Sequence, residues 1–303
     1  MWRVLFAVVM FGAIGVVAIG RQVGGGSVAS AVNAQSSGHG ASYPPAPIPQ
    51  DCRPAPAFDA AAAQNGVSLT SATWSAFGRP ELGWEVYAPL TAHEIASVCP
   101  PQSSGFAQAL AAWQRAHGVS PNGVMDEPTL KALKQVWMRR RPFVLAMAKG
   151  SCPAPASPDQ LAWIAAGEGY SGKPAQLQTQ ALTAYRAMIA AVRAEAPEAA
   201  ADHRLLTIFS GYREPLADLV SCEASGVCGT IERARCSAHR TGMAVDLYLG
   251  AAPGFSPDST ADQNRLWQSH TPIYRWLVAN AGRFGFVSYP FEPWHWEWTG
   301  APP

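Results

Sequence analysis

The chain has almost no excess of charge of either sign. Its 303 residues carry 22 Lys and Arg against 21 Asp and Glu, for a formal net charge of +1. Because a nucleic-acid partner favours a basic patch on the protein, this balance argues against nucleic-acid binding.

Two common motifs are also missing. No Gly-x-Ser-x-Gly elbow surrounds Ser237, so this serine is not predicted to be a nucleophile. Cys222, Cys228 and Cys236 do not have Cys-x-x-Cys spacing, which favours structural disulfides over a second metal site in this stretch.

The composition is sufficient for folded domains with long connections. Hydrophobic residues make up 48% of the chain, which is ample for a core. A length of 303 residues corresponds to about two domains of ordinary size. The 26 prolines and 27 glycines are concentrated outside the helical stretches, so we expect long connectors.

The N-terminus has the pattern of an export segment. Arg3 is followed by an apolar run whose length, about seventeen residues, lies between a signal core and a full membrane span. Residues 1–22 are predicted to be either a cleaved signal peptide or an uncleaved membrane anchor. Residues 23–50, rich in Gly, Ser, Ala and Pro, are predicted to be a flexible linker. The rest would lie in the periplasm or cell envelope, anchored to the inner membrane if residues 1–22 are kept.

Six cysteines in an exported chain predict disulfides. Three precede the C-terminal region and three lie within it. If all six are oxidised, at least one disulfide must join the two groups, and the sequence leaves the pairing open. The cysteines are Cys52, Cys99, Cys152, Cys222, Cys228 and Cys236.

Histidine and carboxylate side chains gather in two C-terminal segments. Zinc prefers imidazole nitrogen and carboxylate oxygen, and a catalytic site offers three protein ligands while leaving a fourth position to water. His239, Asp246 and His295 are predicted to be these three ligands. Glu292, three residues before His295, is predicted to be the base that takes a proton from the water.

The first of these segments is predicted to end in a strand over residues 244–249. Alternation puts Asp246 and Tyr248 on one face and three aliphatic residues on the core face, Val245, Leu247 and Leu249. Gly242 lets the preceding loop bend, so that His239 folds back over Asp246. A surface pair between Asp246 and Arg240 is the alternative, but an otherwise apolar strand favours a carboxylate facing a cleft.

The second segment repeats this alternation over residues 294–298. Its three tryptophans share the core face, and His295 and Glu297 share the other. Glu292 has the wrong parity for the His295 face, but Pro293 marks a bend that would turn it toward the metal. Glu297 is the rival base. It lies about 7 Å along the strand from His295, which favours contact with the substrate or support of a ligand.

The pattern Ser-x-His-x-x-Gly-x-Ala-x-Asp followed by Glu-x-x-His resembles the signature of the VanY/VanX-type D-alanyl-D-alanine peptidases. These belong to the LAS group of zinc peptidases. The family's upstream arginine, which contacts the substrate carboxylate or the developing oxyanion, matches Arg213. The motif positions are Ser237, His239, Gly242, Ala244, Asp246, Glu292 and His295.

The resemblance implies a zinc cofactor and an α+β fold over residues 159–303, a hedgehog-like or D-Ala-D-Ala-peptidase-like domain with a central antiparallel sheet. It implies a peptidoglycan stem peptide as substrate, cut at its D-Ala-D-Ala terminus. An endopeptidase or an L,D-carboxypeptidase of the same fold stays open, because loop shape decides which end of a peptide fits. The alternative of another class is a non-catalytic wall-binding protein, which would have no need of Glu292 as a base.

Residues 51–145 are predicted to form a small helical bundle, followed by a linker over residues 146–158. Apolar residues recur at helical spacing up to Gly118, a helix stop, and Asp126 caps a second helix that ends before Pro142. Residues 106–133 resemble the peptidoglycan-binding module, which implies contact with the glycan. The alternative is a bundle that braces the enzyme. The pattern departs from the module at Trp113-Gln114, in place of Phe-Gln, and at Asn122-Gly123, in place of Asp-Gly.

The remaining periodicity supports the same fold class. A helix is predicted over residues 176–196, a strand over residues 205–209, and a further helix over residues 265–281 before the last strands. Helices that are separated from the strands along the chain indicate an α+β fold.

Overall fold

The computed structural model describes residues 52–150, 152–226, 228 and 236–300. The predicted export segment 1–22 and the predicted linker 23–50 lie outside these residues. Within the part of the chain that is described, no helix is long and apolar enough to cross a membrane. The described residues all belong to one compact unit.

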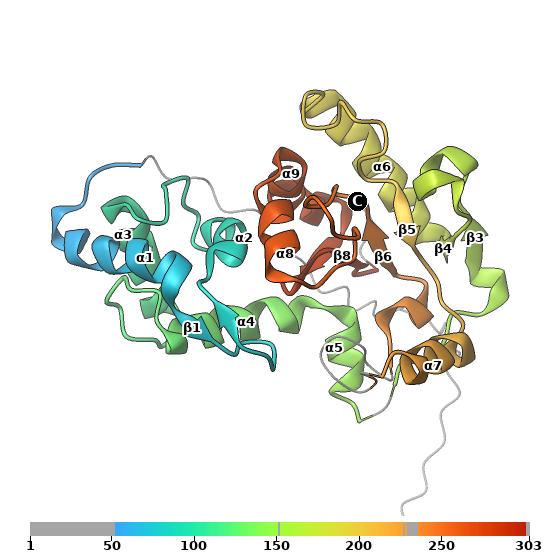
Figure 1. Ribbon diagram of the computed structural model, residues 1–303, viewed down its shortest axis with the longest axis horizontal. Coiled ribbons are helices and arrows are strands. Elements are labelled where there is room, and N and C mark those ends of the chain that lie inside the picture. Colours follow the sequence, from blue (N-terminus) through green and yellow to red (C-terminus); the bar gives the residue numbers. More distant parts are fainter. Residues whose placement is uncertain (1–51, 151, 227, 229–235, 301–303) are drawn as a thin grey trace, which may run out of the picture. The chain divides into compact units, whose positions relative to one another are not determined.

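Helices make up most of the N-terminal half of the described chain. Figure 1 shows α1 and α3 side by side. Two short strands, β1 and β2, pair antiparallel between α1 and α2. The elements are η1 (Pro56–Phe58), α1 (Asp59–Ser71), β1 (Thr73–Trp74), β2 (Glu81–Leu82), η2 (Glu85–Tyr87), α2 (Ala88–Glu94), α3 (Ser104–Ala116), α4 (Glu127–Arg140) and α5 (Pro142–Met147).

The two helices predicted on either side of Gly118 are confirmed as α3 and α4. Ser103 caps α3, because its hydroxyl accepts the Phe106 N–H at 3.2 Å. Gly118 follows the helix with φ +68°, a conformation that favours glycine. Asp126 caps α4 as predicted, and its carboxylate accepts the Thr129 N–H at 3.0 Å.

Polar motif residues hold the loop between α3 and α4. Gln114 is fully buried; its amide donates to the Val124 carbonyl at 2.9 Å and to the Thr129 hydroxyl at 2.8 Å, and its carbonyl accepts the Gly123 N–H at 2.8 Å. A Cβ on Gly123, at φ +74°, would lie 2.6 Å from the Ala107 carbonyl oxygen. These positions therefore support the loop itself, and contact with a glycan stays a prediction.

The chain bends between α4 and α5. α4 ends at Arg140, before Pro142, as predicted. However, Pro142 also begins α5, because its fixed φ and missing N–H suit the first turn of a helix. Arg141 lies at the bend in an extended conformation, with ψ 122°.

The C-terminal half contains a four-stranded antiparallel sheet in the order β5-β6-β8-β7, so the fold is α+β as predicted. A separate hairpin pairs β3 with β4. The elements are η3 (Pro158–Gln160), β3 (Leu161–Trp163), η4 (Ala166–Glu168), η5 (Tyr170–Gly172), β4 (Gln176–Gln178), α6 (Thr179–Glu195), β5 (Ile208–Ser210), α7 (Pro215–Ala224), η6 (Ala238–Thr241), β6 (Ala244–Leu247), α8 (Asp262–Ser269), α9 (Pro272–Asn280), η7 (Ala281–Phe284), β7 (Phe286–Tyr289) and β8 (Glu292–Trp298).

Several predicted element boundaries are wrong. The strand predicted over residues 244–249 ends at Leu247, and the strand predicted from residue 294 begins at Glu292. The helix predicted from residue 176 begins only at Thr179, because residues 176–178 pair with β3 instead. The strand predicted from residue 205 begins at Ile208, after Leu206 adopts φ +66°. The single helix predicted over residues 265–281 is two helices, since Thr271 caps α9 and Pro272 occupies its first turn.

The cysteines described by the structure are all paired. Cys152–Cys236 joins the two groups of three, as full oxidation requires. Cys236 immediately precedes the first motif segment, so this disulfide fixes the start of that segment. The other two pairs are Cys52–Cys99 and Cys222–Cys228.

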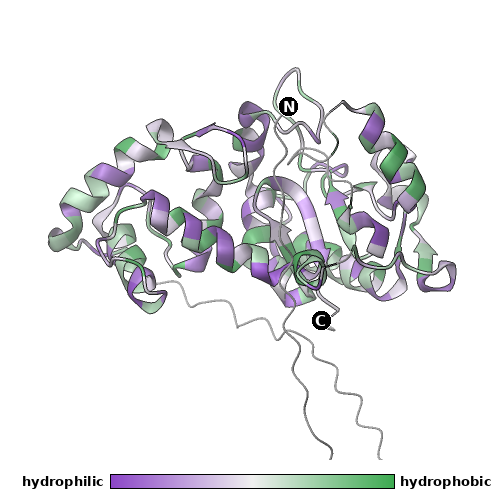
Figure 2. Cartoon of the chain, turned by 90° about the horizontal axis from the view of Figure 1, so that it is seen from below, coloured by the Kyte–Doolittle hydropathy of each residue, from purple (hydrophilic) through white to green (hydrophobic). Residues whose placement is uncertain are grey.

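Aromatic residues of both halves pack in one core. The Phe77 ring lies 5.4 Å from the Phe291 ring and 6.0 Å from the Tyr289 ring, centroid to centroid. The helices carry both hydrophobic and hydrophilic residues, as the green and purple segments of Figure 2 show. Their apolar sides can therefore pack while their polar sides stay solvated. The core face predicted for residues 244–249 is confirmed, because Val245 and Leu247 of β6 and Leu249 just beyond it all belong to the hydrophobic core.

Candidate metal centre

His239 is held in place through both its backbone and its side chain. It lies in η6, whose cap Ser237 accepts the His239 N–H at 3.2 Å, and Gly242 ends this turn with φ +68°. Its Nδ1 lies 2.7 Å from the Gly211 carbonyl oxygen. That contact requires a proton on Nδ1, which leaves the Nε2 lone pair free. Nε2 lies 3.1 Å from Oδ2 of Asp246.

Asp246 and His295 face each other across two neighbouring strands. They are direct partners in the β6–β8 ladder, which places their side chains on the same face of the sheet. Nδ1 of His295 lies 2.9 Å from Oδ1 of Asp246. The sides predicted for Asp246 and for His295 on their own strands therefore meet on one face of the sheet.

The donor atoms of His239, Asp246 and His295 all lie within 4.8 Å of one another, and the three residues are buried. Two imidazole nitrogens and one carboxylate oxygen are a donor set that zinc prefers, and three protein ligands are typical of a catalytic site. The residues therefore fit a zinc ion. Their role as ligands stays a prediction.

The three groups strongly perturb one another electrostatically. Burial lowers the pKa of His239, and the positive charge of Arg213 lowers it further. Burial opposes ionisation of Asp246, but the two histidines outweigh burial and lower the pKa of this carboxyl. Burial also opposes protonation of His295, yet its contacts with Asp246 and Glu297 raise its pKa to about 9. Such mutual perturbation is typical of functional sites.

Glu292 reaches the site through an irregularity in β8. Ser288 of β7 pairs with Trp296, but the next residue, Tyr289, pairs with Glu292, so residues 293–295 form a bulge. Pro293 lies in this bulge, where the bend was predicted. The bulge overcomes the unfavourable strand parity, and Oε2 of Glu292 lies 4.0 Å from Nδ1 of His295. Burial raises the pKa of Glu292, which suits the predicted role of this carboxylate as a base.

Arg213 lies just beyond β5 and is fixed by two side chains. Its Nη2 donates to the Ser237 hydroxyl at 3.0 Å, and its Nη1 lies 3.4 Å from Oδ1 of Asp218. Its backbone N–H also donates to the His239 carbonyl at 3.3 Å. The positive charge of Arg213 adds to the effect of burial in lowering the pKa of His239, and it partly offsets the burial that raises the pKa of Glu292. Its guanidinium therefore acts on the site electrostatically.

The sequence did not identify Asp218. This buried carboxylate lies in the first turn of α7, five residues after Arg213. An acidic residue often occupies the first turn of a helix because it stabilises the helix dipole. The position of Asp218 in the sequence therefore does not indicate a role in the site.

Glu297, the rival base, lies on the far side of the His295 ring. Its Oε1 lies 3.4 Å from Nε2 of His295 and accepts from Nε of Arg141 at 2.7 Å, and its Oε2 accepts the Phe143 N–H at 3.0 Å. Burial opposes ionisation of Glu297, but the charge of Arg141 outweighs it, and the pKa of this carboxyl falls to about 2. A carboxylate this acidic, with both oxygens engaged, is a poor base, which favours the other role predicted for Glu297, support of His295. Arg141 was not identified as part of the site.

Comparison with known proteins gives little further information. None of the family models compared matches the chain, and neither does any curated protein. Three chains of solved structures match. One is a mutant of the vancomycin resistance D,D-pentapeptidase VanY, from a VanB-type resistance cassette, crystallised in complex with Zn(II). The two sequences are 21% identical, the match covers 48% of this chain and 83% of that chain, and the TM-score is 0.28. A likeness this low assigns no function, so the side chains of the site must support any proposal.

Proposed function

We propose that the chain is a zinc peptidase that hydrolyses peptidoglycan stem peptides, as a D-alanyl-D-alanine carboxypeptidase. The convergence of His239, Asp246 and His295 on one buried point, with Glu292 beside it, is the observation that supports hydrolysis most directly. A serine or cysteine nucleophile is not needed to explain the site. The described cysteines are all in disulfides, and Ser237 is occupied as a helix cap.

The roles of the side chains follow from their contacts. His239 through Nε2, Asp246, and His295 through Nδ1 would hold the ion. When bound, zinc polarises a carbonyl and lowers the pKa of water toward neutrality. Glu292 accepts the proton of the attacking water on its carboxylate and returns it to the leaving amine. Arg213, held by Ser237 and Asp218, stabilises negative charge on the substrate carboxylate or on the developing oxyanion.

The motif and the fixed arginine support peptidoglycan as the substrate. The motif around the site resembles that of the VanY/VanX-type peptidases, and Arg213 offers a fixed cation for the C-terminal carboxylate of a peptide.

The predicted export segment 1–22 and linker 23–50 would place the enzyme beside the wall, in the periplasm or cell envelope. The helical segment 51–145 would contact the glycan. Binding of the full chain to insoluble wall, measured with and without substitutions on the helical surface, would test that contact.

The test of the activity uses the zinc-loaded full chain and three substrates. These are a stem pentapeptide ending in D-Ala-D-Ala, a stem tetrapeptide, and cross-linked muropeptides. We expect loss of one D-Ala from the pentapeptide, which Glu292→Gln abolishes. Glu198→Gln, a change of an exposed glutamate on the chain surface, serves as the control and should retain full activity.

The substrate that is cut distinguishes the remaining alternatives. Cleavage of the tetrapeptide alone would indicate an L,D-carboxypeptidase, and cleavage of muropeptides alone an endopeptidase. If the zinc-loaded protein binds wall but cuts none of the three substrates, the chain is a wall-binding protein and the proposed function is wrong. The bulge that turns Glu292 toward His295 argues against that outcome, because a binding protein needs no base there.

A further inference from the structure

A buried arginine from the helical half reaches the sheet of the C-terminal half. Arg141, at the bend between α4 and α5, is only 5% exposed. Its Nε and Nη2 lie 2.7 and 2.5 Å from Oε1 of Glu297 in β8. Its guanidinium also lies over the Tyr289 ring, 3.9 Å from the centroid. Arg141 is thus fixed in place by an ion pair and a cation–π contact.

The bend between the helices directs two donors at one carboxylate. Besides the Arg141 side chain, the Phe143 N–H in the first turn of α5 donates to Oε2 of Glu297 at 3.0 Å. Both oxygens of Glu297 are therefore occupied by groups that lie more than 150 residues earlier in the chain. Since Glu297 is 2% exposed, its charge needs these partners to be stable in the interior.

Glu297 in turn faces one nitrogen of a predicted ligand. Its Oε1 lies 3.4 Å from Nε2 of His295, whereas Nδ1 of that ring points at Asp246. A histidine that binds a metal through one nitrogen commonly directs the N–H of the other at a carboxylate, which fixes the tautomer and the ring orientation. Glu297 has this position relative to His295.

We propose that Arg141 is a positioning residue for the ligand His295. By fixing Glu297, Arg141 keeps the His295 ring turned so that Nδ1 faces Asp246 and His239. The helical half thereby supplies a part of the metal site that residues 159–303 do not contain. This inference rests on the proposed zinc site, and it assigns the bend between α4 and α5 a role beyond any contact with the glycan.

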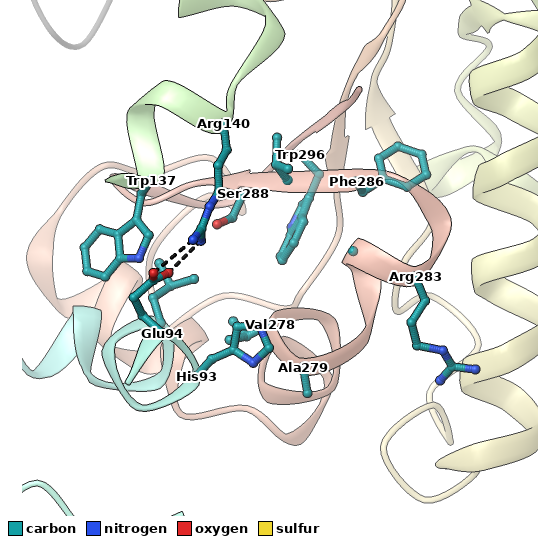
Figure 3. A pocket seen from close by; sticks show the side chains of 13 residues that line it. His93, Glu94, Trp137, Arg140, Val278, Ala279, Arg283, Phe286, Ser288 and Trp296 are labelled. Atoms are coloured by element: carbon teal, nitrogen blue, oxygen red, sulfur yellow. Dashed lines mark hydrogen bonds and ion pairs between the residues drawn. The ribbon is translucent and has the colours of Figure 1, made fainter. Parts of the chain in front are cut away.

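The adjacent arginine provides a matched control. Arg140 also makes a two-point ion pair from the end of α4, with its Nη1 and Nη2 lying 2.6 and 2.9 Å from the carboxylate of Glu94 in α2. Figure 3 shows this pair beside Trp296, at a small cavity of about 210 Å³. Trp296 lies on the other face of β8 from His295. Arg140 and Glu94 both belong to the helical half, so this ion pair, unlike Arg141–Glu297, includes no residue of β8.

The test compares zinc affinity in full-length variants, by competition with a chromophoric chelator at a temperature where circular dichroism shows each variant to be folded. We expect Arg141→Met and Glu297→Gln each to weaken zinc binding about 10–100-fold. The double variant should lose little more than either single one, because both changes interrupt the same path. Arg141→Lys keeps the positive charge but loses the two-point contact of the guanidinium with Glu297, so this variant should lose less zinc affinity than Arg141→Met. Arg140→Met should leave zinc affinity unchanged.

Two further readouts separate positioning from simple stability. The absorption spectrum of the cobalt-substituted protein should change in Arg141→Met, because the orientation of a ligand changes, and remain as in wild type in Arg140→Met. Wild-type zinc affinity and an unchanged cobalt spectrum in Arg141→Met would overturn the inference, as would equal losses in the Arg140 variant. If wild type binds zinc but cuts no peptide, only the proposed function fails, since the zinc titration still tests Arg141.

Discussion

Replacing Arg265 by methionine should destabilise the whole protein strongly. Arg265 in α8 is 1% exposed and joins the two halves of the chain. Its Nη1 donates to Glu81 at 2.8 Å, its Nη2 to the Tyr87 hydroxyl at 2.7 Å, and its Nε to the Phe291 carbonyl at 2.7 Å. Methionine keeps much of the apolar stem, so the change removes the charge and the three donors while leaving little cavity.

The expected cost follows from what is left behind. Glu81 is 5% exposed, and Arg265→Met would leave it with the Tyr87 hydroxyl alone on Oε2. Removing one partner of a buried ion pair costs about 3–5 kcal/mol, because the other charge stays buried without compensation. For a domain of this size that corresponds to a fall in Tm of roughly 6–20 °C.

Urea unfolding with the disulfides intact, followed by tryptophan fluorescence, measures this cost as a fall in the midpoint at constant m. The control is Arg275→Met in α9, an exposed arginine whose loss should change stability by less than about 0.5 kcal/mol. Glu81→Gln combined with Arg265→Met should cost less than the sum of the two single changes. A loss of less than about 1 kcal/mol of unfolding free energy in Arg265→Met would refute the reasoning. The Arg265–Glu81 ion pair would then not stabilise the packing of the two halves.

Three other perturbations have outcomes set by the structure. Removal of zinc with a chelator should abolish peptidase activity and lower Tm. Adding zinc back at about 1,000 times its Kd should restore about 4 kcal/mol of stability, because zinc binds only the folded protein. An unchanged Tm in scanning calorimetry would contradict this prediction. Cys152→Ser with Cys236→Ser should cost about 2–4 kcal/mol in urea unfolding and weaken zinc binding, because the pair fixes the start of the motif segment. Asp218→Asn should lower kcat/KM about tenfold at unchanged zinc affinity, since it loosens Arg213; steady-state kinetics that match wild type would show that Asp218 has no such role.

Short-range patterns in the sequence predicted the parts of the site that depend on strand geometry. Alternation assigned Asp246 and His295 to the side of their strands opposite the aliphatic residues and the tryptophans; the direct pairing of the two residues in the β6–β8 ladder is a tertiary feature that alternation does not predict. The proline after Glu292 indicated a local irregularity, and the bulge over residues 293–295 is that irregularity. The side assignments and the irregularity depend only on neighbouring residues, so one segment at a time was sufficient to predict them.

The missed residues depend on tertiary contacts. Arg141 meets Glu297 across 156 positions, and no periodicity relates residues so far apart. The same holds for residues 176–178. They continue the apolar pattern of the following helix toward the N-terminus, but they pair with β3, and Leu177 is fully buried there. The break between α8 and α9 is different, since Thr271 followed by Pro272 is a local helix-start signal that was present in the sequence.

The most direct test of the central claim is a paired measurement on wild type and Glu292→Gln. Each full-length protein is loaded with zinc, its zinc content is measured, and its products from a D-Ala-D-Ala stem pentapeptide are identified by mass spectrometry. We predict about one zinc ion per chain in both proteins, with D-Ala released by wild type alone. Failure of wild type to bind zinc, or equal release of D-Ala by Glu292→Gln, would contradict the assignment of this site as a zinc peptidase with Glu292 as its base.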